Sequence, residues 1–127
     1  AKYPHLLFIA TSNFTRAVDG AFLSRADLIE NVGMPEPEAC RTILQSAIEE
    51  LARAFPAAGR IVKDPEFERA AKHCVGLDGR RIRKLVIAAC ALNKETAVNP
   101  GGLTAADVLE AAVQAQDEAK SVREEKP

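Results

Sequence analysis

Three arginines and a lysine occupy four of five consecutive positions, in the run Arg-Arg-Ile-Arg-Lys at residues 80–84. Asp78, two residues earlier, is a good N-cap for a helix, because its carboxylate can accept hydrogen bonds from the free N–H groups of the first turn. The helix dipole favours acidic residues in that turn, yet here it carries Arg80 and Arg81. A helix N-terminus beside an arginine can hold a phosphate group. The stretch is therefore a candidate phosphate site, and the alternative is an ordinary solvated basic face.

A second candidate lies near the start of the chain. Residues 6–10 form an unbroken apolar run, Leu-Leu-Phe-Ile-Ala, which Thr-Ser-Asn follows at once. Such a run predicts a strand buried on both faces, as in parallel α/β sheets. Ligands bind at the carboxyl ends of these strands, so Asn13 is placed to orient a water molecule or a phosphate. Taken alone, Ser-Asn after a strand is more often only a turn.

A third candidate, Arg25, lies between a short helix predicted around residues 14–22 and a second predicted strand at residues 28–32. An arginine in such a place is usually solvated, or paired with a nearby acid such as Asp27. Beyond the strand, Gly-Met-Pro-Glu-Pro at residues 33–37 can continue neither element, because each proline lacks an N–H and fixes φ. We place a domain boundary there, between residues 1–35 and 36–120.

The elements that must position the basic stretch are helices. Apolar residues recur every three or four positions after residue 37, which predicts four helices that start near residues 37, 65, 79 and 105. Asp64 is the expected N-cap of the second helix, and Thr104 and Asp107 form a capping box at the fourth. The third helix should run to about residue 96. We also expect a short extended piece at 60–62 and a frayed tail at 121–127.

Composition restricts the class of protein. The chain has 127 residues, is 47% hydrophobic and only 5% aromatic, and carries a net charge of −1, which argues against a dedicated nucleic-acid binder. It has no run of 18 apolar residues and no signal-peptide pattern, so we expect a soluble protein of the cytoplasm, or of the nucleus in a eukaryote. It starts at Ala1 and its only methionine is Met34, so we expect a piece of a longer gene product.

The three cysteines indicate neither a disulfide nor a metal site. Cys40, Cys74 and Cys90 are isolated, odd in number and within helical patterns. We interpret them as reduced thiols of a core, with no disulfide and no metal site.

The order of these elements resembles the back half of an AAA+ ATPase module, its last two core strands and its helical lid. Three motifs resemble more narrowly the pachytene-checkpoint AAA+ remodellers, which act on HORMA-domain proteins. They are Ala-Thr-Ser-Asn at 10–13, Ala-Phe-x-x-Arg-Ala-Asp at 21–27 and Gly-Leu-x-Gly-Arg at 76–80. The resemblance extends from Leu6 to about Ala119. Met34 and Glu36 depart from the family's Gly-Pro-Pro turn.

The resemblance implies a role for each candidate residue. Asn13 matches the sensor 1 asparagine and Arg25 the arginine finger, both catalytic, whereas Gly79 and Arg80 match the nucleotide-binding sensor 2 motif. The implied fold is mostly α: a four-helix AAA+ lid domain at 36–120, preceded at 1–35 by a two-strand remnant of the α/β P-loop ATPase core.

The implied cofactors are ATP and Mg²⁺, held through an ATPase core that this sequence lacks. The implied partners are that core, neighbouring subunits of a ring, most simply a hexamer, and a protein substrate. No membrane partner is expected, and nucleic acid is disfavoured.

The phosphate-binding half of such an enzyme is absent from the sequence. No G-x-x-x-x-G-K-[ST] motif occurs, and no apolar strand ends in an acidic pair that would hold magnesium. We therefore expect this chain to be inactive alone, as the sensing and coupling half of an ATPase. The alternative is a stand-alone helical module whose basic helix 80–84 binds an acidic protein or nucleic acid. The near-neutral charge and the lack of interleaved aromatic residues weigh against it.

Overall fold

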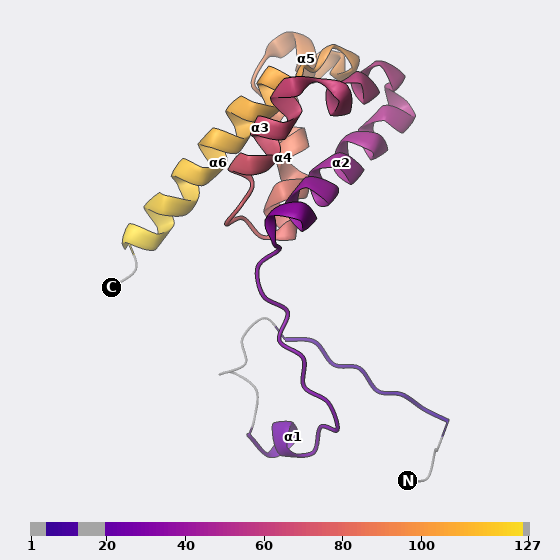
Figure 1. The fold of residues 1–127 in the computed structure, drawn as a ribbon, viewed down its shortest axis with the longest axis vertical. Coiled ribbons are helices and arrows are strands. Elements are labelled where there is room, and N and C mark those ends of the chain that lie inside the picture. Colours follow the sequence, from indigo (N-terminus) through magenta and orange to yellow (C-terminus); the bar gives the residue numbers. More distant parts are fainter. Residues whose placement is uncertain (1–4, 13–19, 126–127) are drawn as a thin grey trace. The chain divides into compact units, whose positions relative to one another are not determined.

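The computed structural model of the chain describes residues 5–12 and 20–125 (Figure 1). The chain divides into two compact units, residues 1–32 and residues 33–127. The second unit is built of helices, and the prediction of a mostly helical chain is confirmed.

In the first unit, α1 (Gly20–Ser24) is the one helix that the described residues form. The strands that we predicted at 6–10 and 28–32 are wrong: both segments lack regular secondary structure. A strand exists only through hydrogen bonds to a neighbouring strand. Neither segment finds a partner strand in the described part of the unit.

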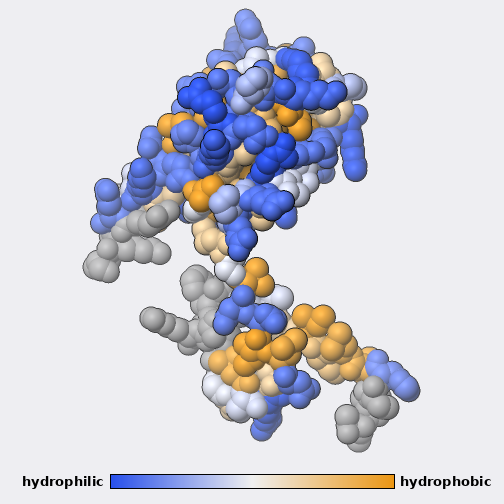
Figure 2. Space-filling model, in the orientation of Figure 1, coloured by the Kyte–Doolittle hydropathy of each residue, from blue (hydrophilic) through white to orange (hydrophobic). Residues whose placement is uncertain are grey.

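Apolar side chains of these two segments lie at the surface. Phe8 is 88% exposed and Val32 is 96% exposed. Figure 2 shows large hydrophobic areas on this unit, whereas the visible face of the helical unit is mainly hydrophilic. Exposed apolar groups on this scale mark a surface that another part of a protein covers, or a liability to aggregate.

The second unit has two long outer helices with two helices between them. α3 and α4 each pack against both α2 and α6 (Figure 1). The elements, in order, are α2 (Pro37–Ala54), the 3₁₀ helix η2 (Pro56–Lys63), α3 (Pro65–His73), α4 (Gly79–Ala91), α5 (Lys94–Val98), the 3₁₀ helix η3 (Pro100–Gly102) and α6 (Ala105–Glu125).

The core is aliphatic, as the composition predicts. Phe67 is the one aromatic residue among the largest fully buried side chains of the described chain. It packs with aliphatic residues from every long helix of the unit, among them Leu44, Ile48, Ile82 and Val108. Burial of each large aliphatic or aromatic side chain is worth about 1.5–3 kcal/mol, so this cluster supplies most of the unit's stability.

The predicted helix starts are confirmed by their caps. The Asp64 carboxylate accepts a hydrogen bond of 2.9 Å from the backbone N–H of Glu66. At the start of α6, the Thr104 hydroxyl accepts from the Asp107 N–H at 3.2 Å, and the Asp107 carboxylate accepts from the Thr104 N–H at 3.0 Å. This reciprocal pair is the predicted capping box.

The extended piece predicted at 60–62 is wrong, because these residues are part of the 3₁₀ helix η2. Ile61 is buried there, and the Arg60 guanidinium donates to the carbonyls of Gly101 at 3.0 Å and Leu103 at 3.1 Å. These contacts hold the turn against residues more than forty positions away, which a local pattern does not reveal.

The third helix is shorter than predicted and the last one longer. α4 ends at Ala91 and α5 is a separate helix. The Thr96 hydroxyl donates to the carbonyls of Cys90 at 2.7 Å and Asn93 at 3.1 Å. The first of these bonds satisfies a terminal carbonyl of α4 across the turn. At the other end, α6 continues through residues 121–125, which we had expected to be frayed.

Candidate functional site

Asp78 fixes the start of α4 and engages one of its two first-turn arginines. Its Oδ1 accepts a hydrogen bond of 2.8 Å from the backbone N–H of Arg81. Its Oδ2 lies 3.8 Å from the Nε of the same arginine. The carboxylate therefore serves as the predicted N-cap and also partly neutralises Arg81.

Arg80 lies at the same helix start without such a partner. It is exposed, and within the described part of the chain it makes no hydrogen bond or ion pair. Arg83 and Lys84 are likewise exposed and unpaired there. An unpaired guanidinium next to the first-turn N–H groups of a helix is suited to bind phosphate oxygens.

The buried residues on either side of Asp78 anchor this helix start. Leu77 and Ile82 are both fully buried, and they occupy the N′ and N4 positions of a hydrophobic staple. Gly79 is half-buried, and a β-carbon there would lie 3.6 Å from Ile43 Cδ1, an ordinary van der Waals contact. Packing therefore does not by itself require a glycine at residue 79.

The turn from α3 into α4 is held by a side chain of α6. The Gln116 amide donates hydrogen bonds of 2.6 Å to the carbonyls of both His73 and Val75. Gly76, which follows, has a φ of +96°, a conformation that residues with a side chain rarely adopt. Together these features set the direction from which α4, and with it Arg80, leaves the turn.

Arg25 follows directly after α1 and is exposed. The alternative pairing with Asp27 is not formed, and no ion pair of Arg25 occurs within the described residues. Gly79 and Arg80 thus lie together at the start of α4, Arg25 belongs to the other unit, and Asn13 lies outside the described residues.

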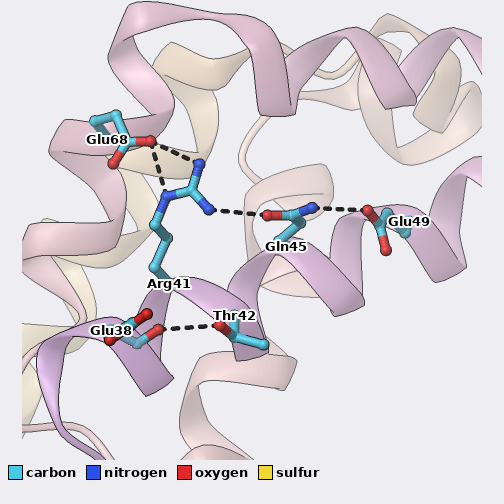
Figure 3. Close-up of polar contacts among 6 residues, drawn as sticks. All are labelled: Glu38, Arg41, Thr42, Gln45, Glu49 and Glu68. Carbon is cyan, nitrogen blue, oxygen red and sulfur yellow. Dashed lines mark hydrogen bonds and ion pairs between the residues drawn. The ribbon is translucent and has the colours of Figure 1, made fainter.

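A network around Arg41 that was not predicted from the sequence joins α2 to α3 (Figure 3). The Nε and Nη2 atoms of Arg41 each lie 2.8 Å from Glu68 Oε1, and Nη1 donates to Gln45 Oε1 at 3.0 Å. The guanidinium carbon lies 5.3 Å from the centre of the Phe67 ring, a cation–π contact. The spacing of Arg41 and Gln45, four residues apart, was the available signal, whereas Glu68 could not be found locally.

A groove between α4 and α6 was also missed. Its walls carry charged and polar side chains and its floor is apolar. The lining residues are Arg81, Lys84, Leu85 and Ala88 of α4 and Ala111, Gln114, Ala115, Glu118 and Val122 of α6. On each helix they recur at three and four positions, the spacing of one helix face.

The cysteines are poor nucleophiles in this fold. Burial, with a smaller contribution from Cys40, raises the pKa of Cys74 to about 12. Burial also raises the pKa of Cys40 and, together with the Asp107 carboxylate, that of Cys90. All three are free thiols, and the described residues contain no group of three His, Cys, Asp or Glu side chains placed to hold a metal ion.

None of the helices in the described chain is long and apolar enough to cross a membrane.

The chain is similar to named proteins that are much longer. It is 45% identical over 115 residues to CD-NTase-associated protein 6 of Pseudomonas aeruginosa, which covers 91% of this chain and 38% of that protein. It is 32% identical over 142 residues to a pachytene checkpoint protein 2 homolog of Oryza sativa subsp. indica, with 89% and 29% covered. Against pachytene checkpoint protein 2 of Saccharomyces cerevisiae it is 37% identical over 95 residues, with 66% and 17% covered.

The chain thus spans less than two fifths of the length of these relatives. No family model and no solved structure matches it. The pachytene checkpoint protein 2 homologues suggest an AAA+ ATPase-like family for this chain.

Proposed function

We propose that this chain is the sensing and coupling part of an AAA+ ATPase that remodels proteins, and that Arg80 binds the phosphates of its nucleotide. The observation that carries the proposal is the difference between two adjacent arginines. Arg81 is engaged by Asp78, whereas Arg80 is exposed and unpaired within the described chain. The longer protein would supply the phosphate-binding loop, its lysine and the magnesium ligand.

The helical unit would then act as the lid. Phosphoryl transfer spreads negative charge over the γ-phosphate, so catalysis depends mainly on positioning and on electrostatic stabilisation. Arg80 would contact the phosphates from the lid side, and the angle of the lid would change with the nucleotide state. The buried Leu77 and Ile82 would transmit that angle, because they fix the start of α4 to the core of the unit.

The unit of residues 1–32 would belong to the ATPase core. Its exposed apolar side chains, such as Phe8 and Val32, would be covered by the rest of that core. Asn13 would orient the attacking water, and Arg25 would reach into the site of a neighbouring subunit of the ring. From the resemblance to the pachytene-checkpoint remodellers, we propose HORMA-domain proteins as the substrate class.

Mixing of subunits tests this assignment in the longer protein that contains the chain. Because the target of Arg25 lies in the next subunit, Arg25→Ala should preserve nucleotide binding and remove hydrolysis. A trans arginine is worth about 10³–10⁵ in rate. Mutant subunits mixed into wild-type rings should therefore inhibit turnover more than dilution does.

Arg53→Ala is the control, since Arg53 is an exposed residue of α2 with no ion pair among the described residues. It should leave turnover unchanged. Simple dilution by Arg25→Ala subunits would contradict the proposed role of Arg25, and a longer protein without ATPase activity would contradict the proposed function.

A further inference from the structure

The groove between α4 and α6 is a second candidate binding site. It does not include Arg80, which we assign to the nucleotide. Its floor contains Leu85, Ala111 and Ala115. Val122, which is 46% exposed, lies at the α6 wall. Small side chains such as alanine allow another backbone to approach closely. The floor can therefore accept apolar side chains of a bound segment.

The two walls of the groove differ in charge. The α4 wall presents Arg81 and Lys84, whereas the α6 wall presents Glu118. Asp78, the N-cap of α4, partly neutralises Arg81, but α4 itself contains no acidic residue, and Lys84 has no ion pair within the described chain. A ligand that carries carboxylates along one side and apolar groups below would match this distribution of charge.

We infer that the α4–α6 groove binds an acidic amphipathic helix of a partner protein. Apolar side chains of that helix lie on the alanine floor, and its carboxylates pair with Lys84 and Arg81. A nucleic acid fits less well, because the groove offers no aromatic side chain for stacking. The inference does not depend on nucleotide binding by Arg80.

The test uses the whole 127-residue chain. The probe is a fluorescein-labelled synthetic helix with leucine and glutamate at helical spacing. Two control peptides replace its glutamates by lysine or its leucines by serine. Fluorescence anisotropy gives the affinity, and amide chemical shifts locate the site. We expect the leucine–glutamate peptide to bind and to shift residues of α4 and α6, and both control peptides to bind much more weakly.

Matched variants assign the binding to the groove. Lys84→Glu reverses one wall, and Ala88→Glu adds charge to an exposed groove position without opening the core. Each should weaken binding about tenfold or more, the factor that corresponds to 1.4 kcal/mol. The controls, Lys72→Glu on α3 and Ala106→Glu on α6, change exposed residues that do not line the groove and should leave affinity within about twofold.

Several outcomes would overturn the inference. Equal binding of the lysine peptide, competition by a single-stranded oligonucleotide, or chemical shift changes outside α4 and α6 would each do so. A self-association that Lys84→Glu abolishes would assign the groove to a second copy of the chain instead. The absence of binding up to millimolar peptide would likewise count against a partner helix.

Discussion

Asp78 contacts Arg81 through both carboxylate oxygens and leaves the adjacent Arg80 free. One oxygen accepts the Arg81 backbone N–H at 2.8 Å, and the other lies 3.8 Å from the Arg81 side chain. Two neighbouring residues of the same type thus have different electrostatic surroundings. This difference, and not the number of arginines, makes Arg80 the candidate phosphate ligand.

Gly76→Ala should destabilise the helical unit by about 1–2 kcal/mol, the cost of a left-handed conformation for a residue with a β-carbon. The φ of +96° at Gly76 creates that cost, and the nearest atom, Gln116 Nε2, is 3.9 Å from the new carbon. Gly102→Ala is the matched control, because nothing lies within 4 Å of its β-carbon and its φ is not positive. Urea denaturation measures both, and equal stability of the two variants would contradict the account of this turn.

Arg41→Ala should lower stability by about 1 kcal/mol, since a cation–π contact contributes about 0.5–1 kcal/mol and an exposed ion pair less. Arg41 joins α2 to α3 through Glu68 and also covers Phe67. Arg69→Ala is the control, because its ion pair with Glu66 lies within one helix and both partners are partly exposed. Thermal melts followed by circular dichroism should show a larger loss of stability for Arg41→Ala than for Arg69→Ala. A larger loss for Arg69→Ala would contradict the role given to the Arg41 network.

The raised pKa of Cys74 predicts a loss of stability at alkaline pH. In the unfolded chain the thiol ionises near its ordinary pKa of 9.0, whereas in the folded chain it stays protonated up to about 12. The unfolded state then binds fewer protons, so the free energy of unfolding falls as pH rises above 9, by up to about 1.4 kcal/mol per pH unit.

Denaturation at a series of alkaline pH values checks this slope. Cys74→Ala lowers stability at neutral pH but should show a shallower decline above pH 9, because the titrating group is gone. Other groups titrate in the same range, and the comparison with the parent chain removes their contribution. Parallel slopes for Cys74→Ala and the parent chain would mean that the thiol is not shielded from water.

The helical unit was predictable from sequence where the determining contacts are local. The caps at Asp64, Asp78 and Thr104 involve residues two or three positions away, so residue types along the chain suffice to find them. The contacts of Arg60 with Gly101 and of Gln116 with His73 join residues more than forty positions apart. No local pattern indicates such contacts, and the segment at 60–62, which Arg60 anchors, was predicted wrongly as extended.

The predicted strands illustrate a different limit. The apolar run at 6–10 has the composition of a buried strand, but a strand needs a partner that the pattern cannot supply. The candidate site shows the same division. Arg80 and its neighbour Asp78 were found from their types and spacing, whereas the groove beside Lys84 depends on how α4 packs against α6.

Nucleotide affinity of the longer protein tests the central claim most directly. Arg80→Ala should raise the Kd for ATP about tenfold to a hundredfold, because hydrogen bonds to charged groups contribute about 1.5–3 kcal/mol. Arg83→Ala removes another exposed and unpaired arginine of the same helix and should leave the Kd for ATP within about twofold. Neither substitution should lower the melting temperature by more than about two degrees. A Kd that responds equally to both substitutions, or to neither, would contradict the assignment of Arg80 to the phosphates.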